Sequence, residues 1–322
     1  MTTGAQAVVD AGGEELTRIM DRVERRMAEL AAGHGAVLAR YAGDTISAGG
    51  KRLRPLLVCI AAGAPPPETD GLVRAAVAVE LVHGATLVHD DVLDGSALRR
   101  GRPTVVATGG RDVAIATGDL LFSRAFAELA GGGGSADAVR ILSRASRELA
   151  LGELAQREDA FNPEVTVRRY LARCRLKTAV LFRAACELGA LEADSDPEAL
   201  GAFGERIGLA FQILDDVLDV SGPPERTGKP RGADLLDGTV NLPLILARAL
   251  DPELAALDLR AVRTADDAAA VCERIGATGA LATARSRARE LVADAKLELP
   301  ALPARQRAAL ELVADVLVER YE

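Results

Sequence analysis

The chain alternates long stretches of helical periodicity with short breaks at glycine and proline. From Glu14 to Leu38, apolar residues recur at spacings of three and four with charged residues between them, the pattern of an amphipathic helix. The same period recurs in Leu72–Leu93, Val113–Ala130, Ala136–Glu158, Val165–Leu188, Pro197–Val220, Leu242–Ala249, Ala265–Ile275, Ala280–Leu297 and Ala304–Tyr321. Alternation of β-branched or aromatic residues with polar ones is nearly absent, which disfavours a sheet. We therefore predict an all-α protein.

The breaks between these stretches are too short to be domain linkers. They consist of a few glycines and prolines, as at residues 64–67, 131–134 and 222–224, and such residues end helices. With 49% hydrophobic residues, the chain has enough apolar material for a large core. We expect one all-α domain that spans residues 1–322.

Composition narrows the functional classes. The chain carries 39 basic and 47 acidic residues, a net charge of −8, and only 3% aromatic residues, which disfavours nonspecific nucleic-acid binding. Its four cysteines form no Cys-x-x-Cys pair, as is typical of a reducing compartment. The start lacks a basic segment followed by an apolar one, and the longest uncharged stretch, residues 55–67, is too short to cross a bilayer. We expect a cytoplasmic protein with no transmembrane segment.

One acidic sequence occurs twice, each time at the end of an apolar helical stretch. DDVLD at residues 90–94 recurs at residues 215–219. Residues four apart on a helix share a face, so Asp90 and Asp94 point the same way, as do Asp215 and Asp219. Three carboxylates at a helix C-terminus repel one another and the negative end of the helix dipole. Each cluster therefore requires positive charge.

Mg²⁺ meets that requirement, because it prefers hard oxygen ligands, keeps several waters and bridges to phosphate groups. A single acidic cluster could equally be a solvated helix end. Two identical clusters favour a metal site.

Basic residues lie in glycine-containing segments near both clusters. GGKRLRP spans residues 49–55, RRGRPT follows the first cluster at residues 99–104, and GKPRG follows the second at residues 228–232. Arginine and lysine bind phosphate oxygens, and glycine allows close backbone approach. Each segment alone could be a solvated loop, but their combination with the acidic clusters points to a diphosphate substrate.

Together, these motifs make the chain similar to trans-isoprenyl diphosphate synthases, the polyprenyl synthetase family. The resemblance rests on GGKRLRP at 49–55, HDDVLD at 89–94, RRGRPT at 99–104, LKT at 176–178, FQILDDVLD at 211–219 and GKPRGADL at 228–235, in the family's order. It implies an orthogonal bundle of antiparallel helices around a deep apolar cavity, usually as a homodimer. The family often has a second lysine where this chain has Thr239, so one phosphate-binding cation of the family is missing here.

The resemblance also implies the ligands and the site residues. The substrates are isopentenyl diphosphate and an allylic prenyl diphosphate, accompanied by three Mg²⁺ ions. Metal ligands of the DDxxD pattern are Asp90, Asp94 and Asp215, supported by Asp91, Asp216 and Asp219. Residues for isopentenyl diphosphate are Lys51, Arg54, His83 and Arg100. Residues for the allylic diphosphate are Arg99, Lys177, Thr178, Gln212 and Lys229. Those expected to take part in catalysis are Asp90, Asp94, Asp215, Lys177 and Gln212, and Gln156 matches a position that faces the reacting centre.

The charges of such a site suggest its reaction. Mg²⁺ and the basic side chains draw electrons from the leaving diphosphate, so that the allylic C–O bond ionises. The double bond of isopentenyl diphosphate attacks the allylic cation, and a proton is then lost to the released diphosphate. An apolar interior keeps water away from the cation.

Product length is predicted from the residues before the first cluster. Ala85 and Thr86 lie about one helical turn before Asp90. In the family, a bulky aromatic residue there gives short products, whereas both residues are small here, so we expect a product longer than fifteen carbons. Candidates for a deeper floor, which could equally be ordinary core residues, are Leu81, Val82, Phe122 and Phe126.

Four alternatives remain open at this point. Geranylgeranyl diphosphate synthase is the nearest in chemistry. A class I terpene cyclase would not need the cations Lys51, Arg54 and Arg100. A metal phosphohydrolase that uses His34 and His89 would not explain the second DDVLD. A non-catalytic partner subunit of a heteromeric synthase commonly loses aspartates, whereas this chain keeps all six.

Overall fold

The structure, a computed structural model, describes residues 3–33, 40–43, 45–46, 52–99, 101–131, 134–193, 195–222 and 231–319. The chain forms two compact units. Unit 1 comprises residues 1–146, 181–204 and 298–316, and unit 2 comprises residues 147–180, 205–297 and 317–322. Each unit is helical, which confirms the predicted all-α class.

Unit 1 is built around a set of packed helices and one short hairpin. Its complete helices are α1 (Thr3–Gly12), α2 (Glu14–Ala32), α4 (Leu53–Ala61), α5 (Asp70–Leu93), α6 (Val105–Gly109) and α7 (Arg111–Ala130). It also holds most of α10 (Val180–Leu191) and α18 (Ala304–Glu319), and the first parts of α8 (Ala136–Asp159) and α11 (Pro197–Ser221). The antiparallel strands β1 (Leu98–Arg99) and β2 (Arg102–Pro103) form the hairpin.

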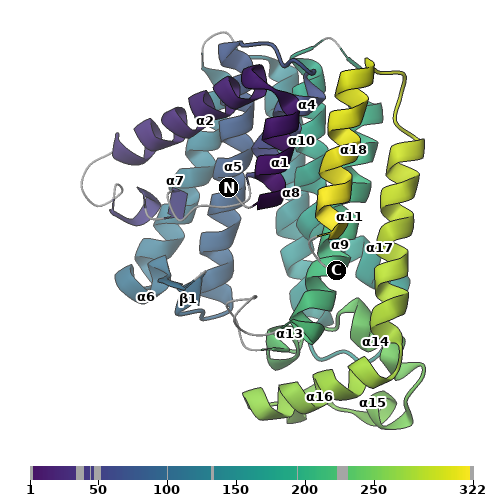
Figure 1. Ribbon diagram of the computed structural model, residues 1–322. Helices are drawn as coiled ribbons and strands as arrows, with labels where there is room; N and C mark the ends of the chain where they lie inside the picture. The colour runs from purple at the N-terminus through teal and green to yellow at the C-terminus, as the bar shows by residue number, and fades with distance from the viewer. Residues whose placement is uncertain are drawn as a thin grey trace. The chain divides into compact units, whose positions relative to one another are not determined.

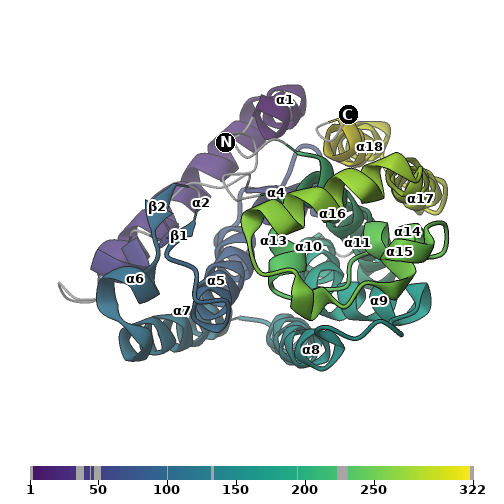
Figure 2. The ribbon, with the colours of Figure 1, turned by 90° about the horizontal axis from the view of Figure 1, so that it is seen from below.

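Helix α5 is the core element of unit 1. Thr69 begins it, because its side-chain oxygen accepts a hydrogen bond from the Leu72 amide at 3.1 Å. α5 packs against α7, α4 and α2, and both ribbon views show it beside α7 (Figures 1 and 2). Most of its residues from Leu72 to Val92 are buried. The first acidic cluster therefore extends from a helix that the core holds firmly.

α5 is also the one helix, within the described ranges, whose length and composition would allow it to cross a membrane. The apolar window that meets this criterion is 67% buried within the structure. A core helix of a globular protein passes the same test, and burial accounts for the apolar composition of α5 without a bilayer.

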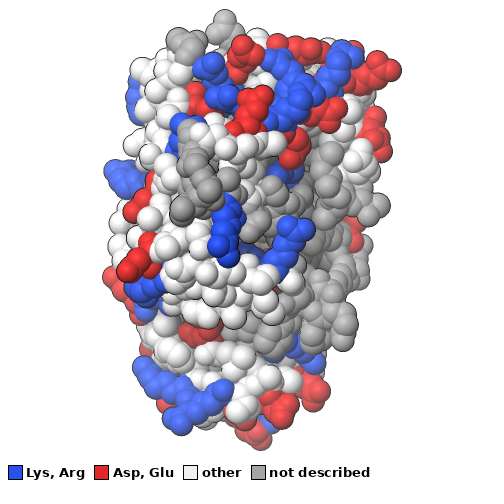
Figure 3. All heavy atoms as spheres, turned by 90° about the vertical axis from the view of Figure 1, so that its left-hand side faces the viewer, with Lys and Arg blue, Asp and Glu red and all other residues white. Residues whose placement is uncertain are grey.

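The outer face of α2 carries paired charges. Arg22 lies 2.5 Å from Asp70, and Arg26 lies 3.0 Å from Glu29. Basic and acidic side chains are intermixed at the upper end of the face in Figure 3. The inner face of α2 buries Leu16, Ile19, Met20, Val23, Met27 and Leu30, as its periodicity predicts.

Arg52 links three segments of unit 1 through buried polar contacts. Its guanidinium lies 2.9 Å from Glu80 of α5 and 2.7 Å from Glu24 of α2, and it donates a 2.8 Å hydrogen bond to the carbonyl of Ile46. The side chains of Arg52 and Glu80 are each 8% exposed. The middle cation of GGKRLRP thus has a structural role in the core.

Unit 2 contains the remainder of α8 and α11 and a series of shorter elements. These are α9 (Val167–Cys174), the π-helical turn η1 (Arg175–Ala179), α13 (Ala233–Leu236), α14 (Leu242–Arg248), α15 (Pro252–Ala256), the 3₁₀ turn η2 (Leu259–Ala261), α16 (Ala265–Ala277) and α17 (Ala280–Leu297). α14 packs against α9, α15, α16 and α17. α16 runs across one end of α17 (Figures 1 and 2).

One predicted helix contains an irregular turn. We expected a helix over Val165–Leu188, and the structure is helical from Val167 to Leu191 but includes the π-helical turn η1 between α9 and α10. In η1 the amide of Val180 donates to the carbonyl of Arg175, five residues earlier. Such a turn holds one extra residue and is frequent at functional sites. The sequence period does not reveal it, because an inserted residue leaves both flanking patterns helical.

The buried position of Arg52 leads to a prediction about stability. We expect Arg52→Ala to lower the free energy of unfolding by about 3 kcal/mol, because it leaves the carboxylate of Glu80 buried without its cation. Arg18→Ala is the matched control: Arg18 pairs with Glu68 at 3.0 Å, but its side chain is 53% exposed. Loss of that exposed pair should leave the free energy of unfolding nearly unchanged. Urea unfolding of both variants measures the difference, and equal losses would contradict it.

Candidate active site

The first acidic cluster ends α5 and divides into an inner and two outer carboxylates. Asp91 is 4% exposed, whereas Asp90 is half-buried and Asp94 is exposed. Asp94 caps the helix, and its amide donates to the carbonyl of Asp90 at 2.8 Å. Successive helical residues are rotated by about 100°, which turns Asp91 away from its neighbours. The outer pair is thus the one that helical spacing predicts for one face.

The inner carboxylate of this cluster binds Arg99. The Nε and Nη2 atoms of Arg99 each lie 2.8 Å from Oδ1 of Asp91. Arg99 comes from β1, so this ion pair ties the hairpin to the end of α5. A guanidinium has five N–H donors, so the contacts to Asp91 leave donors that could reach a phosphate. The predicted diphosphate role of Arg99 remains a prediction.

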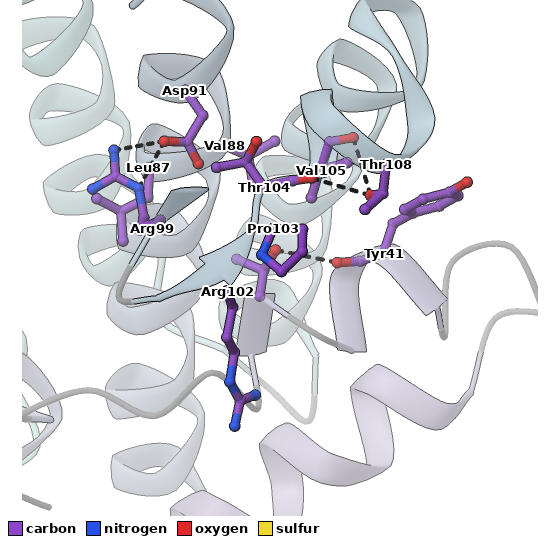
Figure 4. A pocket seen from close by; sticks show the side chains of 11 residues that line it. Tyr41, Leu87, Val88, Asp91, Arg99, Arg102, Pro103, Thr104, Val105 and Thr108 are labelled. Atoms are coloured by element: carbon purple, nitrogen blue, oxygen red, sulfur yellow. Dashed lines mark hydrogen bonds and ion pairs between the residues drawn. The ribbon is translucent and has the colours of Figure 1, made fainter. Parts of the chain in front are cut away.

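A pocket of about 220 Å³ lies beside this ion pair. Figure 4 shows Asp91 and Arg99 facing each other on one side of it and Tyr41 on the other. Its remaining lining residues are Thr45, Leu87, Val88, Arg102, Pro103, Thr104, Val105 and Thr108. The hydroxyl of Thr104 donates to the carbonyl of Ser96 at 2.6 Å. Its oxygen also accepts from the amide of Ala107, so that Thr104 is the N-cap of α6. Thr104 thereby fixes the hairpin and α6 to each other.

Three of the predicted phosphate-binding cations, Lys51, Arg100 and Lys229, lie outside the described residues, as does His34. Arg54 is described, and its guanidinium lies 4.5 Å from the ring centroid of Phe182, a stacking contact that orients the group. His83 lines a small cavity of about 20 Å³ together with Arg52 and Glu80.

His89, which directly precedes the first cluster, has structural contacts. Its Nε2 lies 3.3 Å from the carbonyl oxygen of Ile115 and 3.5 Å from Asp119. Its ring stacks on Phe122 at a centroid distance of 5.9 Å. These contacts give His89 a structural role on α5.

The second acidic cluster, on α11 in unit 2, repeats the division seen in the first. Asp216 is 4% exposed, whereas Asp215 is exposed and Asp219 is half-buried. The Tyr170 hydroxyl donates to one carboxylate oxygen of Asp216 at 2.6 Å, and the Gln212 amide donates to the other at 2.7 Å. Burial and, after it, the nearby charge of Asp234 together raise the pKa of Asp216 to about 8.

Asp219 anchors the segment that follows the second cluster. Its carboxylate accepts a 3.3 Å hydrogen bond from the amide of Asp234, and its carbonyl accepts one from Gly232 at 2.9 Å. The Asp234 carboxylate accepts from Asn241, which caps α14, at 3.2 Å. Thr239, which replaces the family's lysine, lies in this turn and donates its amide to the carbonyl of Asp234 at 2.8 Å.

Lys177 and Thr178 lie on the π-helical turn η1, opposite different partners. The Nζ of Lys177 is 2.6 Å from the carboxylate of Glu153 on α8. The hydroxyl of Thr178 donates to Oε1 of Gln212 at 2.6 Å. Lys177 holds the pKa of Glu153 below its usual value against the opposing effect of burial. The structure thus brings Thr178, Gln212 and Asp216 together within unit 2.

The donor set suits Mg²⁺, although it forms no closed metal site. In the part of the chain that the structure describes, no three His, Cys, Asp or Glu side chains are arranged to enclose an ion. Mg²⁺ is usually bound by one or two carboxylates together with waters and substrate phosphates. The outer aspartates, one turn apart in each cluster, offer carboxylates of this kind, so the residues present fit the ion.

The predicted chain-length residues lie on α5 as expected. Ala85 is 0% exposed, whereas Thr86 is half-buried and donates its hydroxyl to the carbonyl of His83 at 2.8 Å. Among the floor candidates, Leu81 and Val82 are fully buried, and Phe122 and Phe126 are half-buried. Gln156 is half-buried on α8.

Sequence reasoning missed two residues of this site. Tyr170 and Glu153 contact Asp216 and Lys177, but neither belongs to a motif that carries a basic or acidic cluster. Glu153 lies beside Gly152 in a segment that the resemblance singled out only for Gln156. A carboxylate within reach of a predicted phosphate-binding lysine is apparent only from the packing of α8 against η1.

The chain is similar to known proteins in both sequence and structure. A family model described as polyprenyl synthetase matches residues 36–275. The chain is 41% identical over 229 residues to heptaprenyl diphosphate synthase component 2 of Geobacillus stearothermophilus, covering 70% of this chain and 71% of that protein. It is 35% identical over 283 residues to octaprenyl diphosphate synthase of Escherichia coli, covering 85% and 87%. A polyprenyl synthase from Caulobacter crescentus, solved with calcium and isoprenyl diphosphate, has a TM-score of 0.89, 37% identity and coverage of 99% and 98%.

The tight contact of α8 with η1 generates a stability prediction. A Cβ added at Gly152 would lie 2.4 Å from the backbone nitrogen of Lys177, so we expect Gly152→Ala to destabilise the protein by about 1–3 kcal/mol. Gly276→Ala on α16 is the control, since the nearest atom to an added Cβ there, on Leu281, is 3.9 Å away. Alanine favours a helix, so this control stays neutral or gains up to about 1 kcal/mol. Thermal unfolding distinguishes the two, and a neutral Gly152→Ala would contradict the close contact.

Proposed function

The chain belongs to the polyprenyl synthetase family and is a prenyltransferase, and we propose that it condenses isopentenyl diphosphate with an allylic diphosphate to give an all-trans polyprenyl diphosphate longer than C15. The related heptaprenyl and octaprenyl diphosphate synthases support the long-chain type. The observation that carries the proposed mechanism is the repeated acidic cluster, in which the inner aspartate is buried and the outer two are more exposed.

The outer aspartates are the proposed metal ligands. Asp90 and Asp94 of the first cluster and Asp215 of the second would hold the Mg²⁺ that accompanies the allylic diphosphate, with Asp219 in support. Bound Mg²⁺ supplies positive charge that stabilises the leaving diphosphate. The related Caulobacter protein was solved with calcium and isoprenyl diphosphate, which supports the binding of a divalent ion and a diphosphate in this proposal. Asp91 and Asp216 hold Arg99 and Gln212 in place, and we propose that they support the metal site through these contacts.

The basic side chains divide between the two substrates. Arg99, Lys177 and Lys229 contact the allylic diphosphate, and Lys51, Arg54, His83 and Arg100 contact isopentenyl diphosphate. The ion pair with Asp91 fixes the position of Arg99, and the ion pair with Glu153 fixes that of Lys177. A preorganised cation stabilises the charge that develops on the leaving group without a further cost of reorganisation.

The polar oxygens of Thr178 and Gln212 are proposed to face the allylic cation. Their dipoles stabilise positive charge at carbon, while apolar surroundings keep water from quenching it. The double bond of isopentenyl diphosphate then attacks, and the released diphosphate accepts the proton that is lost. Each cycle adds five carbons, so the length of the channel for the tail sets the product.

The proposed assembly is a homodimer in the cytoplasm that acts without a second protein. Retention of all six aspartates supports an active catalytic chain. The Geobacillus relative, however, is named as component 2 of a synthase, which makes a heteromeric assembly the second candidate. Activity of the purified chain alone favours the first, and activity only after addition of a partner chain favours the second.

The function and its metal sites can be tested in one assay. Incubated with farnesyl diphosphate, isopentenyl diphosphate and Mg²⁺, the purified chain should form longer prenyl diphosphates, and chelation of the metal should abolish them. Asp90→Asn and Asp215→Asn should each lower kcat by about a hundredfold or more, because each removes charge that stabilises the leaving group.

The control for charge loss is Asp21→Asn on the exposed face of α2, which should leave kcat unchanged. A cyclised hydrocarbon product would favour a terpene cyclase. A product that stops at C20 would identify a geranylgeranyl diphosphate synthase. Full activity of both site variants would refute the metal assignment.

Product length depends on the small residues one turn before Asp90. Thr86→Phe is expected to shorten the product, because the ring would enter the path of the tail, whereas Thr86→Val keeps the size and should keep the product. Ala85→Phe should act in the same direction, although Ala85 is fully buried and overpacking there costs about 1–3 kcal/mol. Chromatography of radiolabelled products measures the chain length. Unchanged length in both phenylalanine variants would show that the tail does not follow α5.

A further inference from the structure

Four residues of unit 2 form a continuous hydrogen-bonded ladder between two helical segments. Tyr170 on α9 donates to Asp216 at 2.6 Å, Gln212 donates to the other oxygen of Asp216 at 2.7 Å, and Thr178 on η1 donates to Gln212 at 2.6 Å. Tyr170 is 0% exposed and Asp216 4%. Gln212 and Asp216 lie one turn apart on α11, so one side of the ladder is a single helical face.

The ladder has a direction. The NH₂ group of Gln212 donates to Asp216, and an amide NH₂ can only donate. The amide oxygen of Gln212 then faces Thr178 and accepts the proton of that hydroxyl. With its proton engaged, the oxygen of Thr178 presents only lone pairs to its remaining surroundings.

The π-helical turn places both ends of the ladder on one continuous segment. Tyr170, at one end of the ladder, lies on α9. Thr178, at the other end, lies eight residues later on η1. The extra residue of η1 shifts the side chains that follow it relative to an unbroken helix. Gly152 of α8 fits closely against the backbone of this turn at Leu176 and Lys177, directly before Thr178.

We propose that Tyr170 is a positioning residue for catalysis: its hydroxyl holds Asp216 so that the amide of Gln212 and the hydroxyl of Thr178 keep their oxygens directed as acceptors toward the developing allylic cation. This inference rests on the proposed function. Tyr170 itself touches neither substrate nor metal in this proposal and acts only through Asp216 and Gln212. Loss of its hydroxyl frees the carboxylate to rotate and allows the amide to turn over.

The test uses the small number of glutamines in the chain. There are four, Gln6, Gln156, Gln212 and Gln306, so labelling with glutamine carrying ¹⁵N in its side chain gives four pairs of side-chain amide signals. Gln306 is an internal control, because it is 4% exposed and its amide donates to the carbonyls of Ile60 and Ala61 at 3.0 and 2.9 Å in unit 1. Tyr170→Phe should shift the Gln212 signals and speed their hydrogen exchange, and leave those of Gln306 unchanged.

Kinetics provide the second readout. Tyr170→Phe should lower kcat about tenfold, the lower end of the range for residues that orient a ligand, while KM for either diphosphate changes by less than about twofold. Thr178→Val should cost less in the Tyr170→Phe background than in the native chain, because residues in one network are not additive. A purely structural tyrosine would lower thermal stability and leave kcat of the folded protein unchanged.

The outcomes separate this inference from the proposed function. If the native chain makes no longer prenyl diphosphates, the proposed function fails, while the Gln212 signals still decide whether Tyr170 fixes the amide. If Tyr170→Phe does not fold, Thr178→Val perturbs the same amide from the other end and should shift the same signals. Unchanged Gln212 signals, an unchanged kcat or additive effects of the two substitutions would each overturn the proposal.

Discussion

The crowding of like charges at helix ends is the constraint on which the candidate site depends. Each DDVLD sequence places three carboxylates within five residues of one another, where the helix dipole is already negative. The structure reduces this repulsion by turning the inner aspartate of each cluster into the protein. Asp91 is neutralised by Arg99, and Asp216 is held by two neutral donors, Tyr170 and Gln212.

These two solutions have different electrostatic consequences. An arginine beside Asp91 supplies a full positive charge, whereas hydroxyl and amide groups supply only dipoles. Burial therefore raises the pKa of Asp216 to about 8. A cation close to the second cluster would lower that pKa and favour the ionised carboxylate.

A similar division of tasks occurs within GGKRLRP. Arg52, at the N-terminal end of α4, is buried among Glu24, Glu80 and the carbonyl of Ile46. Arg54, two residues later, lies over the ring of Phe182. The backbone of Arg52 adopts a left-handed conformation with φ of 48°, which is uncommon for residues other than glycine. Arg52 and Arg54 thus serve different tasks, and their spacing alone does not reveal which of the two is structural.

The sequence predicted most of the long helices correctly and missed elements for identifiable reasons. Periodicity located α2, α5, α7, α8 and α11 to within a few residues of their observed starts. It missed α4, because seven consecutive residues from Pro55 to Ala61 are buried and a helix that is apolar all round has no polar face to mark its period. It missed η1, because the extra residue leaves both flanking patterns intact.

For the site, helical spacing pairs Asp90 with Asp94 and Asp215 with Asp219, and the structure buries the remaining aspartate of each cluster, Asp91 and Asp216. Their partners could not be predicted, because Tyr170 lies 46 residues before Asp216 in a helix that carries no recognisable motif. Such a contact depends on how α9 and η1 pack against α11.

The Asp-Asp-x-x-Asp pattern therefore combines two tasks in one turn of helix. The aspartates at the first and last positions present their charge outward. The aspartate at the second position points inward and fixes the polar groups around it. A substitution at the inner position should then disturb the geometry of the site even where both outer carboxylates are intact.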